Sequence, residues 1–186
     1  MRRLLVAGTV VLAGCTATSA PTNTPNAGLP VMQQTDTGAE VRLTGEAVAS
    51  NDVLPGVAID KVYSTLPTVY NELGIPLNLL DPATRQAGNT RLVLRNRHFG
   101  DANSRYVNCG VSRTAQRAAD AYRVQLSVRT TVEAAEGGSA TRVSTLVEGF
   151  ARANEGSSIT PVRCVSTGVL ESRIAQLLKL RTALQG

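Results

Sequence analysis

Aromatic residues are scarce in this sequence, which has no tryptophan, two phenylalanines and four tyrosines among 186 residues. Proteins that hold single-stranded nucleic acids stack the bases on aromatic side chains, so we do not expect a stacking surface for bases or sugars. Hydrophobic residues still make up 42% of the chain. We therefore predict a core built from Val, Leu, Ile and Ala.

Histidine occurs once, at His98. A Ser-His-Asp hydrolase needs a histidine base, and no Gly-x-Ser-x-Gly segment accompanies this one. No second candidate metal ligand lies four residues from it, at i, i+4 helical spacing, and the segment QAGNT lacks the glycine and lysine pattern of a phosphate-binding loop. We predict no metal and no cofactor. His98 is best interpreted as a polar loop residue, with a catalytic base as the alternative.

Carboxylates are the other candidates for acid and base chemistry, since glycosidases use two of them. Each candidate has a structural explanation: a helix cap for Asp60, an exposed helix face for Glu72, a turn for Asp81 and an exposed strand face for Glu148. We predict that the chain is not an enzyme, and an enzyme using His98 or a carboxylate pair is the weakest hypothesis.

The longest early apolar run, Leu4 to Leu12, is far shorter than the roughly 20 residues of a membrane-spanning helix. Two arginines precede it, and the small residues Ala13 and Gly14 follow it. A basic head, an apolar core and small residues before a cleavage point are typical of a secretory signal. We predict that residues 1–14 are a signal peptide.

The four residues Leu12-Ala13-Gly14-Cys15 resemble the lipobox of bacterial lipoproteins. This resemblance implies that Cys15 is diacylated on its sulfur, that residues 1–14 are removed, and that the new amino terminus is acylated. Thr16 in place of an aspartate implies sorting to the outer membrane, facing the periplasm. The alternative is an ordinary cleaved secretory signal with an incidental cysteine. The first partner that we expect is thus the membrane itself, bound through the lipid.

Charge and cysteine content fit an exported chain. The formal charge is +5, and losing the arginines at positions 2 and 3 reduces it to 17 − 14 = +3. Cys109 and Cys164 form an even pair in an exported protein, which predicts one disulfide. A redox-active or metal-binding pair is the alternative, but such pairs usually occur as a close C-x-x-C.

Residues 15–39 are rich in Thr, Pro, Asn and Ser. This composition cannot bury enough apolar surface to fold, so we predict a flexible tether that spans roughly 25 to 30 Å. Residues 40–186 are then one domain. Its expected start is a strand from Val41 to Ala49, followed by the turn SNDVLPG. A helix should begin at Asp60 as N-cap and end before Gly74, with Pro67 bending it or splitting off its first turn.

The remainder predicts a mostly antiparallel sheet and a final helix. We expect a turn at DPATRQAG, a strand from 90 to 95, a hairpin of strands 122–132 and 141–151, and a helix from 169 to 184. One face of the first hairpin strand is apolar, and Arg123, Gln125, Ser127, Arg129 and Glu133 share the other. These elements predict an α+β fold in which an antiparallel sheet carries two helices on one face, curling around the last helix in the helix-grip manner.

Part of the sequence is similar to the repeat domain of the small accessory lipoprotein of the outer-membrane β-barrel assembly machinery. The similar part consists of the helical stretch VYSTLPTVYNELGI, a short strand and the turn DPATRQAG. The resemblance covers about Val57 to Leu94. It implies an accessory role in the envelope and a protein partner there.

Arginine is concentrated between positions 85 and 105, with only Asp101 against it. Arginine forks pair with phosphate or carboxylate, so this stretch is a candidate site for lipid headgroups, lipopolysaccharide phosphates or an acidic protein. The alternative is a solvated strand face and loop. The candidate residues are Arg85, Arg91, Arg95, Arg97, His98 and Arg105.

The preferred hypothesis is a membrane-anchored envelope lipoprotein acting as a non-enzymatic interaction or accessory module. The alternative hypothesis is a periplasmic carrier that holds a small apolar or anionic ligand in a cavity between sheet and helix. We expect no nucleic-acid partner for an exported, lipid-tethered chain. Partner identity and oligomeric state do not follow from the sequence.

Overall fold

The computed structural model describes residues 32–33, 42–43, 49–95, 97–112, 114–135, 137–153 and 161–184. The helices are α1 (Ile59–Glu72), α2 (Ala118–Ala121) and α3 (Val169–Leu184), with a short 3-10 helix η1 at Asn103–Arg105. The strands are β1 (Met32–Gln33), β2 (Arg42–Leu43), β3 (Ser50–Pro55), β4 (Leu79–Asp81), β5 (Gln86–Leu94), β6 (Val107–Asn108), β7 (Arg123–Ala134), β8 (Ala140–Arg152) and β9 (Val162–Ser166).

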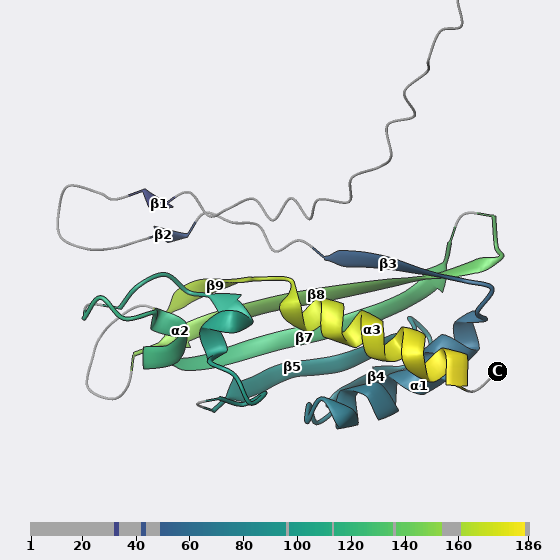
Figure 1. Cartoon of the computed structure of the whole chain (residues 1–186), viewed down its shortest axis with the longest axis horizontal. Coiled ribbons are helices and arrows are strands. Elements are labelled where there is room, and N and C mark those ends of the chain that lie inside the picture. Colours follow the sequence, from purple (N-terminus) through teal and green to yellow (C-terminus); the bar gives the residue numbers. More distant parts are fainter. Residues whose placement is uncertain are drawn as a thin grey trace, which may run out of the picture.

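The main sheet is antiparallel and is built around the long β7–β8 hairpin (Figure 1). Its strand order is β4-β5-β7-β8-β9-β6. Strand β3 also pairs with β8, along residues 140–145, while β9 pairs with residues 148–151 of the same strand. Two short strands thus share one edge of β8. The hairpin predicted from sequence is present, and its strands, of 12 and 13 residues, are only slightly longer than expected.

The protein has two layers, because α1 and α3 pack together on one face of this sheet (Figure 1). Alternate residues of β7 and β8 point toward the helices and are buried, among them Val124, Leu126 and Val147. Leu66 of α1 and Leu178 of α3 complete the core at 0% exposure. The predicted α+β fold with two helices on one face is therefore the observed fold.

The core contains more than the predicted aliphatic residues. Tyr70 and Tyr106 are among its largest fully buried side chains. The hydroxyl groups of Tyr70 and Thr130 share a hydrogen bond of 2.8 Å, and Thr130 shares another of 3.0 Å with Thr145 on the adjacent strand. Burial raises the pKa of the Tyr70 hydroxyl well above its ordinary value. This chain of hydroxyl groups ties α1 to the centre of the sheet.

Helix α1 forms where its apolar residues recur at helical spacing, with Val62, Leu66 and Val69 buried. Its N-cap is Ala58, so the prediction of Asp60 as the cap is wrong. Asp60 instead lies in the first turn, where a negative charge is favourable to the helix dipole. Gly74 follows the helix at φ +67°, as predicted. The assigned helix is continuous through Pro67.

The strand predicted from Val41 to Ala49 is confirmed at β2, and its predicted end is wrong, because Ala49 lies outside any strand. Positions 41 and 44–48 lie outside the described residues. The turn predicted after this strand is also wrong. The segment SNDVLP, predicted as a turn, is strand β3. Strand β5 also begins at Gln86, inside the predicted turn. Pairing with β8 and β7 supplies these backbone groups with hydrogen bonds, which outweighs the turn preference of the side chains.

Candidate functional site: the arginine end of the outer sheet face

The face of the sheet that points away from α1 and α3, called the outer face below, carries the alternate residues of β7 and β8. These side chains are half-buried or exposed, whereas their neighbours in sequence are buried beneath the helices. The set includes Ser127, Arg129, Ser144, Leu146 and Glu148. The described helices thus leave one broad side of the sheet open.

At one end of this face the hairpin register places Arg123 of β7 directly opposite Arg152 of β8. Gln125 lies opposite Phe150 in the same pair of strands, and Arg163 of β9 lies opposite Phe150 on its other side. Phe150 is 51% exposed. Like charges directly opposite each other on adjacent strands destabilise a sheet. This arrangement therefore costs stability, which favours a functional explanation.

Neither Arg123 nor Arg152 has an ion pair or a side-chain hydrogen bond among the described residues. Together with Gln125 and Phe150 they line a hollow of about 360 Å³. This volume lies at the lower end of the range of small-ligand pockets.

A second hollow of about 500 Å³ adjoins the first, because Arg123 lines both. Arg95, at the end of β5, lies in this second lining with Asp120 of α2. Arg95 also has no ion pair or side-chain hydrogen bond among the described residues. We call these side chains the arginine end: Arg95, Arg123, Gln125, Phe150 and Arg152.

The middle of the outer face carries a small ion-pair cluster. Glu148 lies 3.6 Å from the guanidinium of Arg129 and 3.5 Å from that of Arg163. These two cations therefore have an acidic partner, whereas Arg123 and Arg152 have none among the described residues.

The arginine stretch predicted from sequence does not form one site. Arg85 and Arg95 lie at opposite ends of β5, about 30 Å apart for a strand of this length. Arg85 lies 3.5 Å from Asp60, and Arg105 lies 2.9 Å from Asp101. Only Arg95 of the predicted set joins the arginine end.

The other members of the predicted set are spread over β5 and the following loop. Arg91 is exposed at the irregular pairing between residues 89 and 92 of β5. Arg97 occupies a turn at φ +57°. His98 is half-buried, and its ring meets that of Phe99 edge-on at 4.7 Å between centroids, which favours the interpretation as a structural loop residue.

Asp101 connects its loop to the first turns of α3 through hydrogen bonds and ion pairs. Its carboxylate accepts hydrogen bonds from the Tyr106 hydroxyl at 3.0 Å and from Arg173 of α3 at 3.2 Å, in addition to the ion pair with Arg105. Arg173 also donates to the Tyr106 oxygen at 2.6 Å. The hydrogen bond from Tyr106, followed by the charge of Arg105, holds the pKa of Asp101 below its ordinary value.

This lowered pKa predicts a pH-dependent contribution to stability. The stabilisation is fully present above the unfolded pKa, at about pH 4, and is lost as the pH falls through the folded pKa. We expect Asp101→Asn to lower the urea midpoint at pH 7, with a difference from the parent protein that shrinks below about pH 4. Asp60→Asn, at an exposed position with one ion pair of 3.5 Å, is the control and should change little. A pH-independent deficit in Asp101→Asn would contradict the assignment.

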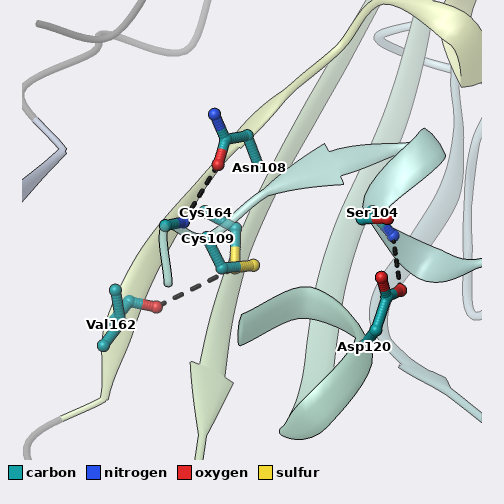
Figure 2. The surroundings of a disulfide bond; sticks show 7 residues. Ser104, Asn108, Cys109, Asp120, Val162 and Cys164 are labelled. Carbon is teal, nitrogen blue, oxygen red and sulfur yellow. Dashed lines mark hydrogen bonds between the residues drawn. A yellow bond between two sulfur atoms is a disulfide. The ribbon is translucent and has the colours of Figure 1, made fainter. Parts of the chain in front are cut away.

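Cys109 and Cys164 form a disulfide in the structure, which joins the end of β6 to β9 (Figure 2). The two cysteines continue the β6–β9 ladder, in which Asn108 is opposite Val165. Both are 2% exposed. Beside the bond, Asp120 of α2 accepts a hydrogen bond from the Ser104 amide at 2.8 Å (Figure 2). The disulfide fastens this segment to β9, and the Ser104–Asp120 contact holds η1 and α2 together within the segment.

The carboxylates considered for catalysis each have a local partner. Asp81 accepts hydrogen bonds from the Ala83 amide and the Thr84 hydroxyl, as its predicted turn role requires. Glu72 of α1 pairs with Arg181 of α3 at 2.6 Å. Among the described residues, no three His, Cys, Asp or Glu side chains form a group that could hold a metal ion.

No protein-family model matches the chain, and no curated protein matches it. The similarity to the accessory lipoprotein of the β-barrel assembly machinery thus stays a prediction. The signal peptide, the lipobox with Cys15 and, apart from β1, the tether lie outside the described residues. No helix in the described part of the chain is long and apolar enough to cross a membrane.

Sequence reasoning missed Arg152 and Phe150, and it placed Arg123 on an exposed face without a role. The signal was present in the hairpin, since the register of two paired strands decides which side chains lie opposite each other. Counting outward from the turn at Gly137 and Gly138 brings Arg123 and Arg152 to the same end of the same face.

Proposed function

We propose that the chain is a membrane-anchored lipoprotein of the bacterial envelope, held by lipid on Cys15, whose domain is a non-enzymatic interaction module. It acts at the outer membrane and faces the periplasm. The observation that carries the interaction role is the open outer face, which ends in an exposed phenylalanine beside arginines that have no ion pair with any described residue. Surfaces that keep unpaired charge beside an exposed aromatic side chain are suited to recognition.

Three features support the anchoring part of the proposal. The lipobox stands at the expected distance behind a basic head and an apolar core. The polar residues 16–39 suit a tether that would hold the domain near the membrane. A disulfide of two buried cysteines fits an oxidising compartment outside the cytoplasm.

The carrier hypothesis places its ligand between the sheet and the helices. Residues at that boundary, among them Val69, Ile174 and Leu178, are fully buried against the sheet. The two hollows described above lie elsewhere, at the arginine end and beside α2. No observation therefore favours the carrier over the interaction module. A small molecule retained by the purified chain in native mass spectrometry would reverse this preference.

The test is site-specific photo-cross-linking of the full chain in cells. A photoreactive amino acid replaces Ser127 on the outer face, and a matched chain carries it at Gln176, an exposed position on α3. We expect an envelope protein to be captured from position 127, much less from position 176, and no longer when Cys15→Ala is added. Equal capture from both positions, or capture unaffected by Cys15→Ala, would contradict the proposal.

A further inference from the structure

We propose that the arginine end binds the phosphate-bearing headgroups of an anionic lipid surface. This inference rests on the proposed function for the location of the domain, since the tether would keep it near a membrane. It goes beyond that function because it assigns a ligand to one end of the outer face and leaves the middle of that face, where Glu148 pairs with Arg129 and Arg163, free for a protein partner.

The chemistry of the arginine end matches a phosphate group. Arg123 and Arg152 project from directly opposed positions, and neither is occupied by an acid of the described chain. A guanidinium offers planar pairs of N–H donors that fit phosphate oxygens, and two of them together can hold one phosphate from both sides. Gln125, two residues along β7 from Arg123 and in the same lining, adds an amide donor. A bound phosphate would also relieve the repulsion between the opposed cations.

No acidic residue lines the first hollow. Glu148 lies two residues before Phe150 along β8 and is shared by Arg129 and Arg163. Asp120 lines the second hollow, but its carboxylate accepts a hydrogen bond from the Ser104 amide. Arg95 extends the positive charge from the first hollow into the second.

The exposed side chain of Phe150 favours a lipid surface over a free phosphate ion as the ligand of this site. Phe150 is 51% exposed and belongs to the lining of the first hollow, and its apolar ring offers a phosphate no hydrogen-bond donor. Peripheral proteins combine basic residues with apolar side chains that enter the boundary between headgroups and acyl chains. An exposed phenylalanine next to two unpaired arginines is this combination, so we assign the site to a bilayer surface.

The test uses the absence of tryptophan from the chain. Phe150→Trp introduces a single indole at the site, and Leu180→Trp introduces one on α3, at a position that is 53% exposed. Both chains carry Cys15→Ser so that no lipid is attached. They are titrated with vesicles of phosphatidylcholine alone or with about one third phosphatidylglycerol, plain or brominated. We expect a blue shift and quenching by brominated lipid for Phe150→Trp with anionic vesicles only, and neither for Leu180→Trp.

Charge variants in the Phe150→Trp chain then locate the contact. Replacing Arg123 and Arg152 by glutamine should weaken binding to anionic vesicles roughly 10- to 30-fold, because each basic residue near an anionic surface contributes on the order of a fivefold change. The matched control replaces Arg91 and Arg142, which removes the same net charge elsewhere on the chain. Binding by this control should fall by less than about threefold.

Several results would overturn the proposal. Equal weakening by both pairs of substitutions would show a diffuse charge effect, and an equal response to inorganic phosphate without vesicles would show a site for a soluble ligand. The chain could be lipid-anchored in cells while its Cys15→Ser form binds neither kind of vesicle. That result would overturn this inference and leave the proposed function standing. Vesicle binding together with an unmodified Cys15 in cells would overturn the anchoring and leave the site in place.

Discussion

Replacing Cys109 and Cys164 together by serine should lower the free energy of unfolding by about 4 kcal/mol and the melting temperature by on the order of 10 °C. The disulfide closes a loop of 55 positions that contains the whole β7–β8 hairpin. Without it the unfolded chain gains conformational freedom, and the short β6–β9 pairing loses its covalent support. Urea and thermal unfolding of the double variant against the parent chain measure both quantities.

The reduced parent protein provides the matching control, since it should unfold at the same midpoint as the double variant. Thiol labelling under native conditions gives a second check, because both cysteines should be unreactive until the protein is reduced. An unchanged midpoint after the double substitution would show that the disulfide does not stabilise the domain. Two reactive thiols in the exported protein would show that the bond does not form.

Leu178→Ala should lower the free energy of unfolding by about 2 to 5 kcal/mol, the range for removing a buried leucine side chain. Leu178 is 0% exposed where α3 meets the sheet and α1, so its loss leaves a cavity at the junction of the layers. Leu180→Ala is the matched control on the same helix, because Leu180 is 53% exposed. The same chemical change there should cost no more than about 0.5 kcal/mol.

Urea denaturation of the two variants decides whether α3 packs as described. A large loss for Leu178→Ala with almost none for Leu180→Ala supports the two-layer arrangement. Similar losses for both variants, or a larger loss for Leu180→Ala, would show that α3 faces the sheet with a different side.

The fold could be predicted from sequence where the spacing of apolar residues matches the pattern of buried positions in the structure. Apolar residues occupy most alternate positions of β7, and α3 has Leu170, Ile174 and Leu178 at helical spacing, so the hairpin and the last helix follow from sequence. Strand β3 could not be predicted from sequence, because Asn51, Asp52 and Pro55 are residue types typical of turns. Its backbone hydrogen bonds come from β8, which lies about 90 residues away in sequence.

The candidate site could be predicted less well than the fold. Arginines that are close in sequence predict a cluster in space, yet an extended strand places Arg85 and Arg95 far apart. Arg123 and Arg152 meet only because the hairpin register places them opposite each other. The disulfide was accessible from sequence because only one pair of cysteines remains once Cys15 is assigned to lipid.

Lipid anchoring is tested most directly by the intact mass of the full chain extracted from the membranes of cells that export it. We predict a chain that begins at Cys15 and carries the added mass of acyl groups on that residue, with Cys15→Ala recovered in the soluble fraction. A membrane-associated chain that begins beyond Cys15, or one that keeps an unmodified Cys15 thiol, would contradict the proposal that this domain is held at the membrane by lipid.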